Sequence, residues 1–181
     1  MLLWAPMMML RLCLLAGLIV MAGSARATVM RAMDLAELTA SAEHIVLGEV
    51  LSSESAWDAK HRTIYSTVEI AVAESWKGQA PGSGRIRLRH FGGIVGDIEM
   101  TVYGEARFQP GERVVVFTQG DHLVGMGQGK RRLGWDRAAK CWVAAPWDRT
   151  GASLMGKAEG DSEPAVPLEM LRAQVRALVG P

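Results

Sequence analysis

The feature that most constrains this fold is a long alternation of side chains over residues 63–76. Successive residues of an extended chain point to opposite faces. One face is apolar and consists of Ile64, Val68, Ile70 and Val72. The other face is mixed and consists of Tyr65, Thr67, Glu69 and Ala73. The stretch exceeds the usual strand length of about 5–6 residues, so it predicts a strongly curved strand of a barrel.

Further strand signals follow one another along the chain, separated by glycine and proline turns. The run Val114-Val115-Val116-Phe117 predicts a strand that is buried on both faces. We expect residues 52–62 to form a polar hairpin connection, and residues 122–126 and 129–135 to form a hairpin. The predicted strands besides 63–76 cover residues 44–51, 85–91, 97–103, 113–119, 122–126, 129–135 and 140–144.

Two helices are predicted, one on each side of the strand region. Residues 34–43 begin with Asp34 as a cap and carry Glu37 at the reciprocal position of a capping box. Residues 167–179 begin with a proline and end before a glycine, as helices often do. The apolar stripe of this second helix consists of Leu168, Leu171, Val175 and Leu178.

Short strands separated by turns, with two peripheral helices, predict a mainly β fold. The expected architecture is a small closed or partly open β-barrel, and a β-sandwich is the alternative. Residues 149–164 are rich in glycine, serine and charge, which indicates a flexible linker. The expected organisation is a signal peptide over 1–27, a β-barrel domain over 28–148, the linker, and a C-terminal helix over 165–181.

Residues 1–27 have the pattern of a secretory signal peptide. Arg11 precedes an apolar run over residues 12–23, and Ser24-Ala25-Arg26-Ala27 is a small-residue exit. A run of about 12 residues is short for a membrane-spanning helix, which needs roughly 20. We therefore expect cleavage after Ala27, a periplasmic or extracellular location, and no membrane span thereafter. A retained membrane anchor is the alternative.

Cleavage would leave a nearly neutral chain with one cysteine. It removes Arg11, Arg26 and no acidic residue, so 18 basic and 19 acidic side chains remain and the net charge is −1. This balance excludes a strong general attraction to nucleic acid. Cys13 is also removed, so Cys141 can form no internal disulfide. We expect Cys141 to be a buried apolar residue, and a Cys141-linked dimer is the alternative.

Parts of the chain resemble known families. Residues 38–50, which contain Val46, Gly48 and Val50 at alternate positions, precede a long strand that ends at Lys77-Gly78. This arrangement resembles the opening of netrin-like domains, the OB-type barrels found in tissue inhibitors of metalloproteinases. Residues 90–96 and 108–117 resemble a family of uncharacterised bacterial exported proteins. The resemblance spans residues 34–133 and implies an OB or netrin-like barrel with two helices.

The mechanism of the metalloproteinase inhibitors does not carry over to this chain. Those proteins place the amine and carbonyl of a disulfide-bonded N-terminal cysteine on the protease zinc. The expected mature start here is Thr28, and no cysteine lies near it. The resemblance therefore implies protease modulation by fold analogy alone, without any inhibitory residue.

The sequence predicts no catalytic residue, no metal ligand and no cofactor. The four histidines after residue 27 are His44, His61, His90 and His122, and no pair has the spacing of a metal site. The nucleophile patterns G-x-S-x-G and S-x-x-K are absent from the sequence. The alternative from another class is a metal-assisted hydrolase. Its candidate ligands are His90, His122, Asp97 and Asp121.

Basic and aromatic residues indicate a binding surface. Arg85, Arg87 and Arg89 share one strand face, and a second basic group at Lys130, Arg131, Arg132, Arg137 and Lys140 is interleaved with tryptophans. The glycine-rich loop 92–96 can present backbone N–H groups to an anion. Its alternative role is a bend or bulge. The predicted binding residues are Arg85, Arg87, Arg89, Gly92, Gly93, Gly96, Trp135 and Trp142.

These observations predict an exported, non-catalytic module that binds a protein or peptide partner and not nucleic acid. A structural envelope component is a further alternative. The alternative for the basic surface is a solvated outer face, with tryptophans in the core and charge balanced by Glu69, Glu99 and Glu105.

Overall fold

The computed structural model describes residues 28–79, 81–147, 152–155 and 163–180. The predicted signal peptide over 1–27 lies outside the described residues. The predicted linker over 149–164 does so in part, and its described residues include strand β11 (Ala152–Met155). Within the described ranges, no helix has the length and apolar character to cross a membrane.

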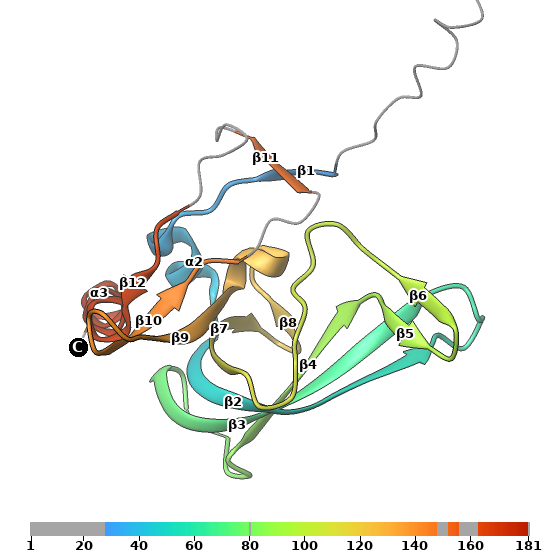
Figure 1. Cartoon of the computed structure of the whole chain (residues 1–181), viewed down its shortest axis with the longest axis horizontal. Helices are drawn as coiled ribbons and strands as arrows, with labels where there is room; N and C mark the ends of the chain where they lie inside the picture. The colour runs from blue at the N-terminus through green and yellow to red at the C-terminus, as the bar shows by residue number, and fades with distance from the viewer. Residues whose placement is uncertain (1–27, 80, 148–151, 156–162, 181) are drawn as a thin grey trace, which may run out of the picture.

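The fold is mainly β and contains an eight-stranded antiparallel sheet with two helices (Figure 1). The strand order is β12-β10-β9-β7-β2-β3-β4, and β8 pairs with β7. The strands of this sheet are β2 (His44–Trp57), β3 (Ile64–Lys77), β4 (Arg85–Phe91), β7 (Arg113–Gln119), β8 (His122–Leu123), β9 (Lys130–Asp136), β10 (Cys141–Ala145) and β12 (Val166–Pro167). The order ends at β12 and β4, so the pairing of the described strands does not close into a barrel.

Two small strand pairs complete the described structure. Strand β1 (Thr28–Arg31) runs parallel to β11, and β5 (Gly93–Val95) pairs antiparallel with β6 (Ile98–Met100). The β5–β6 pair forms an arm that contacts both β2 and β3. The predicted strand over 97–103 is thus confirmed only over residues 98–100, and the predicted connection over 92–96 contains strand β5.

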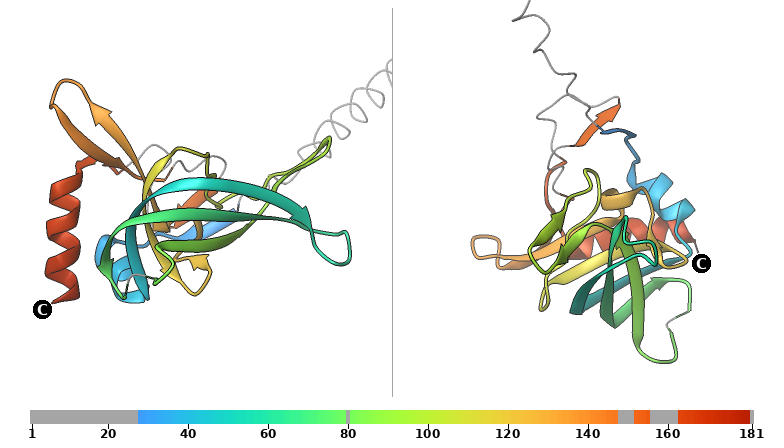
Figure 2. Two further views of the ribbon diagram at one scale, coloured as in Figure 1. Left: turned by 90° about the horizontal axis from the view of Figure 1, so that it is seen from below. Right: turned by 90° about the vertical axis from the view of Figure 1, so that its right-hand side faces the viewer.

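The hairpin of β2 and β3 is the longest feature of the sheet and curves across the molecule (Figure 2). The prediction of a long β3 is confirmed. The prediction of a polar connection over 52–62 is wrong for residues 52–57, because they pair with residues 64–69 and continue β2. Irregular register at Leu47/Gly48 and at Val50/Ser52 accompanies the curvature, since bulges bend a strand and increase its twist.

The two helices match their predicted positions. In α2 (Leu35–Ser41), the Asp34 side chain accepts a hydrogen bond from the Glu37 N–H, and the Glu37 side chain accepts one from the Asp34 N–H. The predicted capping box is therefore confirmed. Helix α3 (Leu168–Val179) buries Leu168, Leu171 and Val175. Leu178 is 48% exposed, so the predicted stripe is wrong at that position, because the last turn extends beyond the covered part of the helix.

Apolar side chains form two cores, one on each face of the central strands. Helices α2 and α3 cover the first core, which contains Leu38, Val175 and Phe117. The second core lies among β2, β3, β4, β7 and the segment that carries Ala106 and Phe108. All four residues of the run 114–117 are fully buried. The prediction of a strand buried on both faces is confirmed.

The predicted hairpin of residues 122–126 with 129–135 is wrong. Strands β8 and β9 both pair with β7, through Thr118↔Leu123 and Val116↔Lys130. A short 3-10 helix, η1 (Met126–Gly129), lies between them. Gly125 has φ +63° and begins a left-handed turn, which returns the chain to the same edge of β7.

Candidate functional site

Two adjoining hollows lie beside the second core. The serine hollow, about 420 Å³, is lined by residues of β2, β3, the end of β4, the β5–β6 arm and the segment 101–110. The lysine hollow, about 320 Å³, is lined by the segment 101–112, β9 and residues 145–147. Both volumes fall within or near the usual size of small-ligand sites. The two hollows adjoin because they share Thr101, Val102, Glu105, Arg107 and Gln109.

Two serine hydroxyls attach the β5–β6 arm to the β2–β3 hairpin. The Ser66 hydroxyl donates to the Gly92 carbonyl over 2.7 Å, and its oxygen lies 2.8 Å from Ser55 Oγ. The Ile94 N–H donates to Ser55 Oγ over 3.3 Å. Gly93 has φ +137°, and a Cβ there would lie 2.2 Å from Ser55 Oγ. Glycine is therefore required for this approach.

His90 lies in the wall of the serine hollow. Its ring centroid is 5.8 Å from that of Phe108, and Nδ1 lies 3.1 Å from the Phe91 carbonyl oxygen. Burial lowers the pKa of His90, and the nearby Lys130 ammonium lowers it further. Because a carbonyl only accepts, the neutral ring carries its proton on Nδ1. Nε2 is then a buried acceptor with no partner among the described residues.

A buried ion pair forms part of the lysine hollow. The Lys130 side chain is 7% exposed, and Nζ lies 2.8 Å from both carboxylate oxygens of Glu112. Nζ also donates to the Arg107 carbonyl and lies 4.4 Å from the Phe108 ring centroid. Burial lowers the pKa of Lys130, while Glu112 opposes that effect. The stability of a buried ammonium depends strongly on its carboxylate partner, which here is Glu112.

Glu105 lines both hollows. Its Oε1 accepts a hydrogen bond from the Phe91 N–H over 3.4 Å. Burial raises the pKa of Glu105. Beside it, Arg107 pairs with Glu99 over 3.3 Å on the exposed rim. The shared segment therefore presents a half-buried carboxyl next to an exposed ion pair.

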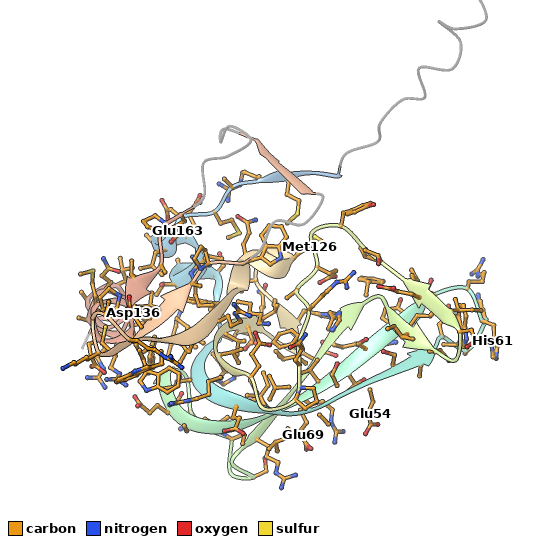
Figure 3. The ribbon with its side chains drawn as sticks, viewed as in Figure 1. Glu54, His61, Glu69, Met126, Asp136 and Glu163 are labelled. Carbon is orange, nitrogen blue, oxygen red and sulfur yellow. The ribbon has the colours of Figure 1, made fainter. Side chains whose placement is uncertain are left out.

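The three predicted arginines lie on the face of β4 that is turned away from the hollows. Leu88 belongs to the second core and His90 lines the serine hollow. Arg89 lies between them in the strand, so it points outward, as do Arg87 and Arg85 at the alternate positions before it. Arg85 pairs with Glu69 over 3.4 Å, and Glu69 lies on the outer side of the curved sheet (Figure 3). The Arg89 guanidinium stacks 3.9 Å over the Tyr65 ring. All three arginines are exposed.

The predicted tryptophans lie on the β9–β10 hairpin, which β7, β2 and β3 separate from β4 in the sheet. Trp135 is 53% exposed. Its ring meets Trp142 edge-on with centroids 5.6 Å apart. The Arg113 guanidinium lies 4.4 Å over Trp142. These aromatic residues form a small surface cluster, and Trp135 does not belong to the core.

The remaining predicted site residues are divided. Gly92 and Gly93 line the serine hollow, while Gly96 lies at the tip of the β5–β6 arm, where a Cβ would meet nothing within 4 Å. The eight predicted binding residues thus occupy four separate places. Cys141 is a free, half-buried thiol at the start of β10.

The predicted second basic group is not one surface. Lys130 and Arg131 are 6% and 4% exposed. The buried Arg131 donates to the Gln128 carbonyl over 2.9 Å and pairs with Glu163 over 3.2 Å. The exposed members of the group are Arg132, Arg137 and Lys140.

The histidines and carboxylates of the hydrolase alternative do not gather. His122 Nδ1 lies 2.9 Å from the Arg89 carbonyl oxygen, and Nε2 lies 3.0 Å from Asp121. In the described part of the chain, no group of three or more His, Cys, Asp or Glu residues is placed to hold a metal ion.

The titration of His90 leads to a pH-dependent stability. Because its pKa is lowered from 6.5 in the fold, the unfolded chain binds the proton more readily below about pH 6.5. The free energy of unfolding should therefore decrease as pH falls through this range. Urea unfolding of the native chain and of His90→Gln, from about pH 5 to about pH 8, measures the effect. We expect the stability advantage of the native chain over the variant to shrink as pH falls.

Glu105 should change the free energy of unfolding with pH in the opposite direction to His90. Its pKa is raised from 4.5, so its contribution to stability is lost as pH rises above about 4.5. Glu105→Gln serves as the matched variant, since it removes titration and keeps a hydrogen-bond acceptor. Parallel pH profiles for the native chain and His90→Gln would contradict the assignment to His90.

Comparison with known proteins does not assign the chain to a family. No protein-family model, no curated protein and no solved structure matches it. The features that bear on function are the geometry of the two hollows and the surfaces around them.

Proposed function

We propose that the protein is an exported, non-catalytic binding module that holds a segment of a protein or peptide partner in the two joined hollows. The observation that carries this proposal is the shared lining of the serine and lysine hollows. Together they offer a site longer than either hollow alone. Mixed apolar and polar linings of this kind suit ligands that present both kinds of group.

The charges of the lining favour a peptide over a polyanion. The lining includes Glu99, Glu105 and Glu112 on the acidic side, and Arg107, Lys130 and Arg132 on the basic side. These formal charges cancel, and two of the basic residues are already paired within the site. A nucleic acid or a phosphate group would instead require excess positive charge.

The rim of the site adds apolar surface for a partner. Ile94 is 61% exposed, Ile98 53% and Tyr103 48%. Ile94 and Ile98 lie on the β5–β6 arm, and Tyr103 follows the arm along the chain. Exposed apolar side chains beside a polar hollow are typical of protein interaction sites.

The fold that we propose is a partly open barrel of OB or netrin-like type. A backbone link supports it: the Arg89 N–H of β4 donates to the Asp121 carbonyl beside β8 over 2.7 Å. Strand β8 pairs with β7, so this bond connects the β4 edge of the sheet to its centre. One backbone bond in place of a full ladder is consistent with a barrel that is open at this seam.

Affinity capture with a blocked site tests the function. Residues 28–181 are immobilised and exposed to envelope and secreted fractions of the source cells, and bound proteins are identified by mass spectrometry. Thr101→Trp places a large side chain at an exposed position that lines both hollows. We expect this variant to lose at least about 90% of the specifically captured partner, because the indole occupies the partner's space.

Ala139→Trp is the matched control, since Ala139 is exposed in the β9–β10 turn and outside both linings. It should retain the partner. A triple replacement of Arg85, Arg87 and Arg89 by alanine examines the outer face of β4 separately. A partner that is held by Thr101→Trp but lost from the arginine variant would move the binding site to that face and refute the proposal.

A further inference from the structure

Two methionine sulfurs from distant parts of the chain meet at Gly104. The Sδ atom of Met30, in β1, lies 2.6 Å from the position that a Cβ of Gly104 would take. The Sδ atom of Met126, in η1, lies 3.7 Å from the same position. Figure 3 shows Met126 on the side of the molecule where β1 lies. A substituted residue at 104 would displace the nearer sulfur, so glycine permits the two thioethers to approach.

Hydrogen bonds hold both methionine-bearing segments in place. Gln128, in η1, is 6% exposed. Its side chain accepts from the Met33 N–H over 2.9 Å and donates to the Arg31 carbonyl over 3.0 Å. The Gly127 N–H donates to the Gly104 carbonyl over 2.8 Å. The flanks of Met30, the η1 turn and Gly104 are therefore fixed to one another before any ligand arrives.

Among the described residues, the sulfur pair belongs to neither of the two hydrophobic cores. Met33 packs against the helix-covered core, as methionine often does when it fills an irregular gap. Neither Met30 nor Met126 is among the residues of the two cores or among those packed against them. Both are half-buried, so an ion can reach them from solvent.

The backbone at Met126 is unfavourable for a residue with a side chain. Met126 has φ +58°, in the left-handed region that favours glycine and asparagine. Such conformations are strained and are concentrated at functional sites. Position 126 thus carries a flexible thioether side chain although its backbone conformation is unfavourable for such a residue.

An aromatic ring lies against the η1 turn that carries Met126. The Trp147 indole packs on Gly127, whose Cβ would lie 2.3 Å from Nε1. Gly127 directly follows Met126. The fluorescence of this indole should therefore report changes at the turn.

From this geometry we infer that Met30 and Met126 bind a soft monovalent cation, Cu(I) or Ag(I). Thioether sulfur selects soft cations, whereas Mg²⁺ and Ca²⁺ require oxygen ligands. The two thioether sulfurs are uncharged. A bound ion would connect β1 to η1 and stabilise the docked N-terminal strand by mass action. The inference is independent of the proposed peptide site.

Silver titration of the chain labelled at the methionine methyl groups tests the inference. Ag(I) is used because it is redox-inert, and methyl resonances report each thioether separately. We expect the Met30 and Met126 methyl signals to shift together and to saturate at one equivalent. The Met170 methyl, on the exposed side of α3, should not shift. Equal shifts at Met170, or no shift at Met30 and Met126, would overturn the inference.

Variants separate metal binding from folding. Leucine is close to methionine in volume, so Met30→Leu and Met126→Leu should retain the fold, which urea unfolding checks. In competition with a coloured Cu(I) chelator, each single variant should bind at least about tenfold more weakly, because one of two ligands is lost. Met170→Leu is the matched control and should bind normally. Unchanged Cu(I) affinity in the double variant would also refute the site.

Discussion

Replacing Glu112 with leucine will lower the free energy of unfolding by about 3–5 kcal/mol. The change leaves the Lys130 ammonium buried with the Arg107 carbonyl and the Phe108 ring as its remaining partners. Removing one member of a buried pair leaves an uncompensated charge, which is far more costly than losing an exposed pair. Urea unfolding at neutral pH measures the loss.

Two further variants define the origin of this effect. The double replacement Lys130→Met/Glu112→Leu should recover most of the stability, because an apolar pair of similar volume needs no charge compensation. Glu99→Gln breaks the exposed pair with Arg107 and should cost less than about 1 kcal/mol. If the double variant is as unstable as Glu112→Leu, the cost arises from lost packing and not from the stranded ammonium.

Replacing Gly48 with alanine will be the second large effect, a loss of about 3 kcal/mol. A Cβ at this position would lie 2.3 Å from the Ala71 carbonyl oxygen and 2.6 Å from Ile70 Cγ2. The first neighbour is backbone, so it can move only if β2 and β3 separate. The register irregularity at Leu47/Gly48 places this contact within the curved part of the hairpin.

Gly134→Ala is the matched control, because Gly134 also lies within a strand but a Cβ there would meet nothing within 4 Å. It should be neutral or slightly stabilising, since alanine restricts the unfolded chain. The midpoint of urea unfolding measures both variants. Equal effects would show that glycine content, and not the close strand approach, determines the stability.

Local patterns predicted the elements whose signals lie within the element itself. Residues 85–91 and 113–119 form strands with the predicted bounds. The Asp34 cap and its reciprocal Glu37 identified the start of α2. Caps and side-chain periodicity involve residues only a few positions apart, so they can be recognised before the chain folds.

Elements that depend on a distant partner were predicted less well. Residues 52–57 are polar and lack a strand signal, yet they extend β2 because β3 supplies a pairing partner along its full length. The separate pairing of β8 and β9 with β7 likewise depends on the left-handed turn at Gly125 and Met126. Tertiary pairing outweighs weak local propensity in both cases.

Of the predicted binding residues, only two glycines line the candidate site. Gly92 and Gly93 line the serine hollow, but Lys130 was expected on a basic surface and is buried against Glu112. No local pattern distinguishes Lys130 from its exposed neighbour Arg132. The difference arises because the segment 101–112 covers one residue and leaves the other open to solvent.

The sequence alone determined the mainly β character, the two helices and the strand buried on both faces, because these follow from the order of neighbouring side chains. The tertiary structure alone decided which charges are buried, which strands share an edge and which sulfurs meet. Lys130 acquires Glu112, and Met30 acquires Met126, through pairings between segments far apart in the chain. Burial and charge compensation are properties of those three-dimensional neighbourhoods, and no stretch of adjacent residues contains them.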